Sequence, residues 1–156
     1  MYWPLKLALW LSLLCAAVGI AFGQSAGRLR PLSGQPGQNA VYELRFLAQD
    51  TISPAARFEL ILPPGFDVSG VQLASSRKMD GGFSVVVAQD TVRILRSGLG
   101  RAVPAGTEVD LLFAAIRNPK EKPLAGQATV RVFSRPDAAP WLLTAPIATD
   151  SSAVQR

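Results

Sequence analysis

The chain contains no histidine, and this limits the chemistry that its side chains could perform. Histidine is the usual general base near neutral pH, so neither a Ser-His-Asp nor a Cys-His arrangement can exist here. Carboxylate chemistry remains, such as the pair of acids that a glycosidase uses. The candidates are Glu43, Glu59, Glu108 and Asp110, each at a polar position of an alternating run. We interpret them as an exposed strand face with cross-strand ion pairs, and we predict no catalytic residue.

A phosphate-binding glycine loop is not supported by the residues around Gly98 and Gly100. Val103 stands where a third glycine would be needed, and Pro104 follows it directly. The binding of phosphate at such a loop requires a helix amino terminus, which this segment does not predict. We therefore predict no cofactor at this loop.

Calcium is a more plausible ligand, because surface β-sandwiches can bind it through loop carboxylates and carbonyl oxygens. Four aspartates lie in predicted loops: Asp50, Asp67, Asp80 and Asp90. None belongs to an Asp-rich loop of the calcium-binding kind, so we interpret them as turn-forming residues and predict no metal site. Whether one of these loops binds calcium is left open by the sequence.

Two groups of side chains could form a binding surface. The first is a cationic patch for an acidic polymer, formed by Arg77, Lys78, Arg93, Arg96 and Arg101. In a regular strand Arg93 and Arg96 point to opposite faces, which argues against the patch. The second is an aromatic platform for a sugar, formed by Phe133 and Trp141, although core or edge packing is the favoured interpretation.

The first 23 residues are typical of a secretory signal peptide. Lys6 precedes an apolar run, and Ala21 and Gly23 provide the small side chains that a cleavage site before Gln24 requires. An uncleaved membrane anchor is the alternative, because residues 5–23 are almost long enough to span a bilayer. If this segment is not cleaved, we expect membrane contact through it alone; if it is cleaved, Cys15 leaves with it.

The mature chain has no other cysteine and a modest excess of basic residues. It must therefore fold in an oxidising compartment without a disulfide and without a cysteine-based metal site. Its basic residues are scattered between apolar positions, whereas a nucleic-acid partner would require a basic stripe with interleaved aromatic residues. We expect no nucleic-acid partner.

Apolar and polar residues alternate with the two-residue period of β-strands along most of the mature chain. The predicted strands cover residues 40–48, 57–62, 68–74, 83–88, 91–95, 107–116, 128–133 and 141–144. Gln89 and Asp90 separate two of them and predict a β-hairpin. We divide the chain into a signal peptide (1–23), a linker or edge strand (24–39), a β-sandwich domain (40–144) and a flexible tail (145–156).

This inventory of about seven or eight short strands with no helical period predicts an all-β fold, an antiparallel sandwich of two sheets. Four segments add a resemblance: Leu62-Pro63-Pro64-Gly65-Phe66, Asp90-Thr91-Val92-Arg93-Ile94, Val103-Pro104-Ala105-Gly106-Thr107 and Ala115-Ile116-Arg117-Asn118-Pro119. Together they resemble an immunoglobulin-like module of prokaryotic secreted and cell-surface proteins. The resemblance implies an extracellular protein without enzymatic activity.

From these observations we expect a secreted, periplasmic or cell-surface protein that acts as a non-catalytic structural or adhesive module. Its partner would be an extracellular protein or an envelope polymer. The alternative is a small carbohydrate-binding protein, which an aromatic row on one sheet face would favour.

Overall fold

The computed structural model describes residues 25–32, 35–121 and 124–148, and within these ranges it contains strands and no helix. None of the described segments is a helix of the length and apolarity needed to cross a membrane. The predicted signal peptide lies outside the described residues. The strands are β1 (Ser25–Ala26), β2 (Arg28–Pro31), β3 (Asn39–Leu47), β4 (Arg57–Ile61), β5 (Leu73–Ser75), β6 (Phe83–Ala88), β7 (Thr91–Arg96), β8 (Glu108–Arg117), β9 (Gln127–Phe133) and β10 (Trp141–Pro146).

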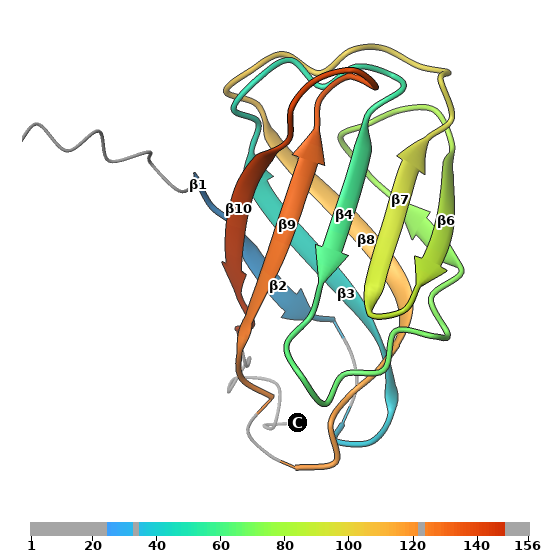
Figure 1. Cartoon of the computed structure of the whole chain (residues 1–156), viewed down its shortest axis with the longest axis vertical. Helices are drawn as coiled ribbons and strands as arrows, with labels where there is room; N and C mark the ends of the chain where they lie inside the picture. Colours follow the sequence, from blue (N-terminus) through green and yellow to red (C-terminus); the bar gives the residue numbers. More distant parts are fainter. Residues whose placement is uncertain (1–24, 33–34, 122–123, 149–156) are drawn as a thin grey trace, which may run out of the picture.

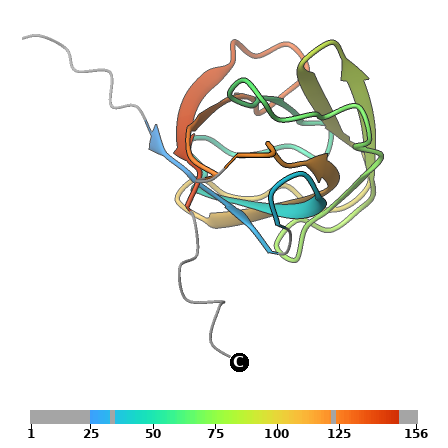
Figure 2. The ribbon, with the colours of Figure 1, turned by 90° about the horizontal axis from the view of Figure 1, so that it is seen from below.

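The strands form two sheets that pack face to face (Figure 1). One sheet has six strands in the order β1-β10-β9-β4-β7-β6, and the other has four in the order β2-β3-β8-β5. All pairs are antiparallel except β1 with β10. Seen from below, the two layers enclose a single interior (Figure 2). The predicted all-β antiparallel sandwich is confirmed, with more strands than the seven or eight expected.

Alternation explains how each strand contributes to the core. In β3, Tyr42, Leu44 and Phe46 are buried between the sheets, and the side chains between them point outward. Phe46 meets Phe58 of the opposite sheet, with ring centroids 6.2 Å apart. The predicted hairpin is present as β6–β7, and Gln89 in its turn has a positive φ of 54°. The period-two pattern therefore fixes which face of each strand is buried.

The sheets extend beyond residues 40–144, which were predicted as the sandwich. Part of segment 24–39, predicted as a linker or edge strand, forms the edge strands β1 and β2, because Leu29 between two arginines is fully buried and anchors the segment. At the other end β10 continues to Pro146, and Ile147 is buried beside Leu29. The N–H of Ala148 donates to the carbonyl of Leu29 at 2.8 Å. Two isolated apolar residues thus draw both flanks of the chain into the fold.

Asn118, from the Ala115-Ile116-Arg117-Asn118-Pro119 segment, has a structural role at one end of the sandwich. The buried hydroxyl of Tyr42 donates to Oδ1 of Asn118 at 2.6 Å, and the amide of Asn118 donates to the carbonyl of Gln35. Burial raises the pKa of Tyr42 to about 12. Phe66, from the Pro-Pro-Gly-Phe segment, packs edge-on against the Tyr42 ring. These contacts join three loops to the core.

Candidate binding face

The outer face of the four-stranded sheet carries a carboxylate surrounded by arginines. Glu43 of β3 is 1% exposed. Arg30 of β2 donates to it at 2.7 Å and Arg45 at 3.0 Å, and Arg77 also pairs with it. Each guanidinium comes from a different segment, so the cluster ties β2, β3 and the loop after β5 together. Three cations on one carboxylate leave an excess of positive charge on this face.

Asp110 of β8 holds the same loop from the other side. Its carboxylate accepts from Nε of Arg77 at 2.7 Å, from the Ser76 hydroxyl at 3.0 Å, and from the N–H groups of Arg77 and Lys78. The loop following β5 is therefore folded around Asp110, and this places Arg77 between the two carboxylates of Glu43 and Asp110.

Both buried carboxyl groups remain ionised in the folded protein. Burial by itself raises the pKa of Glu43, but the hydrogen bonds and charges of Arg45 and Arg30 outweigh it and lower the pKa. For Asp110, burial also opposes ionisation, and the hydrogen bonds from Arg77 and Ser76 again bring the pKa below its usual value. Neither group is in a state to act as a general acid near neutral pH.

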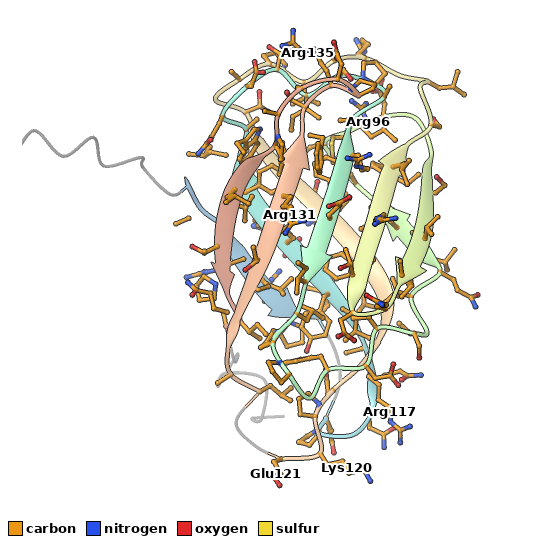
Figure 3. All side chains as sticks on the ribbon, in the orientation of Figure 1. Arg96, Arg117, Lys120, Glu121, Arg131 and Arg135 are labelled. Atoms are coloured by element: carbon orange, nitrogen blue, oxygen red, sulfur yellow. The ribbon has the colours of Figure 1, made fainter. Side chains whose placement is uncertain are left out.

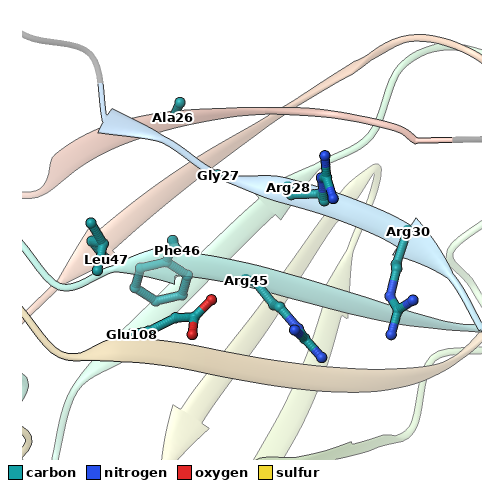
Figure 4. A pocket seen from close by; sticks show the side chains of 8 residues that line it. All are labelled: Ala26, Gly27, Arg28, Arg30, Arg45, Phe46, Leu47 and Glu108. Carbon is teal, nitrogen blue, oxygen red and sulfur yellow. The ribbon is translucent and has the colours of Figure 1, made fainter.

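A hollow of about 390 Å³ lies beside this cluster (Figure 4). Arg28 and Arg30 from β2, Arg45 from β3 and Glu108 at the start of β8 surround it. A second hollow adjoins it across Arg45 and Glu108 and reaches Arg77, Lys78 and Asp110. We call this surface the arginine face, and it consists of Arg28, Arg30, Arg45, Arg77 and Lys78. These five cations face the three acids Glu43, Glu108 and Asp110, which leaves a local charge of 5 − 3 = +2.

The six-stranded sheet carries a similar cluster on its own outer face. Glu59 of β4 is 8% exposed and lies between Arg57, Arg93 and Arg131, with N–O distances of 3.4, 3.4 and 3.7 Å. The guanidinium of Arg57 also lies over the Phe133 ring, 3.9 Å from its centroid. This surface is not part of any of the hollows described above, and its contacts are longer than those of Glu43.

The predicted cross-strand ion pairs are present, but the predicted exposure of the acids is wrong for three of the four. Glu43, Glu59 and Asp110 are all buried beneath arginine side chains, and only Glu108 is exposed. Long arginine side chains cover a short carboxylate when they come from neighbouring strands. The burial of Glu43 could have been expected from the pattern Glu43-x-Arg45, which places both side chains on the same face of the strand.

The five cations considered for a cationic patch do not form one surface, as the opposite orientation of Arg93 and Arg96 implied. Arg96 is buried, and Arg93 lies on the outer face of the six-stranded sheet. Their expected opposite orientation is confirmed. Only Arg77, Lys78 and Arg101 line a common hollow.

Asp50 and Asp67 have turn-forming roles, whereas Asp80 joins two loops. Asp50 accepts from the N–H of Thr51, Asp67 accepts from Ser69, and Asp80 accepts from the N–H of Arg101 at 2.8 Å. Among the described residues, no group of three or more acidic or cysteine side chains is placed to hold a metal ion.

The glycine loop packs against one of these turns. Gly100 has a φ of +94°, and a Cβ there would lie 2.7 Å from the carbonyl oxygen of Asp80. This close approach of two backbones explains why residue 100 is a glycine.

The aromatic pair does not form a platform. Trp141 points into the sandwich, where its ring meets Phe46 at 5.8 Å, whereas Phe133 points outward under Arg57. The two rings lie on opposite faces of the same sheet, as the favoured interpretation of Trp141 as a packing residue implies.

No protein-family model and no curated protein sequence matches the chain. Solved structures do match it. The full-length major pilin SpaD from Corynebacterium diphtheriae aligns at 16% identity with a TM-score of 0.50, over 80% of this chain and 33% of the pilin. A non-cellulosomal cohesin from the archaeon Archaeoglobus fulgidus aligns at 11% identity and a TM-score of 0.43, over 82% of this chain and 95% of the cohesin. The N-terminal domain of the Streptococcus gordonii adhesin Sgo0707 aligns at 11% identity and a TM-score of 0.46, over 81% and 33%.

The similarity to the pilin concerns the fold alone, and it supports the immunoglobulin-like sandwich expected from the sequence. This chain spans about a third of that pilin.

Proposed function

We propose that the chain is a secreted, non-catalytic adhesive module whose arginine face binds a partner with clustered anionic groups. The observation that carries this proposal is the excess of guanidinium groups around Glu43 beside an open hollow. Guanidinium groups bind carboxylates and phosphates through paired N–H donors, and their fixed fork favours such ligands. An acidic envelope polymer or the acidic surface of an extracellular protein supplies this chemistry.

The state of the carboxylates supports a non-catalytic role. A glycosidase needs two acids, one of them with a raised pKa, facing a common space. In the second hollow Arg77 lowers the pKa of Asp110, so Asp110 is not the acid with a raised pKa that such an enzyme needs. The hollow can therefore bind charge, and Asp110 does not act there as a proton donor.

The carbohydrate alternative gains no support from the described residues. Stacking on a sugar ring requires an exposed aromatic surface. Trp141 is turned toward the core, and the Phe133 ring is covered by Arg57.

Secretion is part of the proposal and depends on residues 1–23. The small residues before Gln24 support cleavage, and the mature chain would then be released without cysteine. N-terminal sequencing of the protein recovered outside the cytoplasm tests this: a chain that starts at Gln24 is expected, and an intact Met1 would contradict it.

Binding to polygalacturonate, an acidic polysaccharide, tests the arginine face. We expect retention at low salt that is lost as salt rises, because screened charges attract each other less. Arg28→Gln removes one cation without touching the Glu43 cluster, and it should weaken binding about threefold to tenfold. Lys120→Gln is the matched control, because it removes the same charge at the far end of the sandwich (Figure 3). Equal losses for both variants, or retention that salt does not change, would contradict the proposal.

A further inference from the structure

Edge strand β6 differs from the other sheet edges of the described chain. Natural sheets protect their edges with short strands, charges, proline or bulges. β1 has two residues and β5 has three, and β2 carries two arginines and a proline. β6 has six residues with the sequence Phe-Ser-Val-Val-Val-Ala, no charge, no proline and an unbroken register with β7. Figure 1 shows it at the right-hand edge of the six-stranded sheet.

The hydrogen bonds around β6 show which of its backbone groups are free. The N–H of Ser97 donates to the carbonyl of Gly82 at 2.9 Å, and antiparallel bonding then alternates along the strand. Ser84, Val86 and Ala88 therefore bond to β7. The N–H and C=O groups of Phe83, Val85 and Val87 point away from β7. Within the described ranges, these backbone groups have no hydrogen-bond partner outside the sheet ladder.

The free groups are arranged so that the strand complements itself. A two-fold axis through Val85 pairs this residue with its own copy, and it pairs Phe83 with Val87 of the second copy. All three residue pairs are then of the hydrogen-bonded kind, which gives about six hydrogen bonds across the axis. On the outer face, Val86 is 51% exposed, and this register places it opposite Ser84 of the second copy. No like charges meet inside this pairing, because the strand has none.

We propose that β6 is a homodimerisation edge, at which two copies of the chain pair antiparallel around Val85. The two six-stranded sheets then continue into one another. The opposite edge of each sheet ends at the two-residue strand β1, so the assembly closes at two copies.

Sedimentation velocity of the full-length protein over a range of concentrations tests the proposal. We expect a concentration-dependent dimer for the unmodified chain. Val86→Lys should weaken dimerisation about twofold to fivefold, because the axis brings two lysines to diagonal positions on one face. Leu142→Lys is the matched control, since Leu142 is also 51% exposed on the outer face of the same sheet but lies on β10. The proposal is overturned if the chain stays monomeric, as it would if this edge accepted only a strand of another protein. It is also overturned if both variants weaken dimerisation equally.

A cross-link tests the register independently of affinity. In a Cys15→Ser background, Ser84→Cys and Val86→Cys chains are mixed and oxidised. Opposite residues of a non-hydrogen-bonded pair lie close enough for a disulfide. We expect the mixture to form more disulfide-linked dimer than either chain alone. Cross-linking that does not increase on mixing would overturn the proposed register.

Discussion

Replacing Arg96 tests how the loops at one end of the sandwich are held together. The side chain of Arg96 is 0% exposed. Nη1 donates to the carbonyl of Ser53 at 2.8 Å, and Nη2 donates to the carbonyls of Asp80 and Arg101, both at 2.9 Å. The Asp80 carboxylate is 3.6 Å away. One guanidinium therefore connects three loops that are distant in sequence.

The expected cost of its loss follows from these contacts. A hydrogen bond to a charged group contributes about 1.5–3 kcal/mol, and an unsatisfied buried carbonyl costs about 1–3 kcal/mol. These terms overlap, so we expect Arg96→Ala to lower the free energy of unfolding by about 3–5 kcal/mol. Arg96→Met keeps most of the volume but has no donor, so it should lose about 2–4 kcal/mol.

Urea unfolding monitored by circular dichroism measures both effects. The midpoint should fall while the slope stays unchanged, because the folded and unfolded surfaces are nearly the same. Arg93→Ala is the control: Arg93 is exposed and pairs with Glu59 at 3.4 Å, so its loss should cost less than about 1 kcal/mol. Arg96→Met with a stability within about 0.5 kcal/mol of the unmodified protein would refute the reasoning, since surface substitutions change stability this little.

Three further predictions concern stability. Tyr42→Phe should cost about 1–2 kcal/mol in urea unfolding, because the Asn118 carbonyl loses a buried donor; an unchanged midpoint would contradict this. The lowered pKa values of Glu43 and Asp110 contribute stability at neutral pH that is lost as the pH falls from about 4 through the folded-state values. The double variant Glu43→Gln/Asp110→Asn should therefore be less stable at pH 7 and lose less stability on acidification. Parallel curves of unfolding free energy against pH for the variant and the unmodified protein would refute this. Gly100→Ala should lower the melting temperature, at a cost of about 1–3 kcal/mol, since its positive φ and the nearby Asp80 carbonyl oppose a Cβ; an unchanged melting temperature would refute it.

The fold was predictable because the alternation is local. The rows Tyr42-Leu44-Phe46 and Val92-Ile94 are visible without knowledge of the neighbouring strands. The boundaries were less predictable: Leu29 is a single apolar residue, and its burial depends on β10, which lies far away in the sequence.

The charged clusters could be predicted only in part. Ion pairing follows from residue types, but burial of Glu43 requires Arg30 and Arg77 to come from other segments. Arg96 continues the inward row of Val92 and Ile94, which was a usable signal for its burial. Its carbonyl partners lie on loops, and their positions depend on the assembled fold.

The parallel contact between β1 and β10 determines how the domain would respond to tension on its two ends. The first and last strands along the described chain lie side by side and run in the same direction, and the contact continues in the Leu29–Ile147 bridge. Tension applied to opposite ends of such strands slides them past each other, so the bonds from Gly27 to Thr144 and from Ala148 to Leu29 are stretched together. An antiparallel terminal pair would instead be peeled apart one bond at a time under the same pull. The geometry therefore gives the domain the shear arrangement that resists stretching.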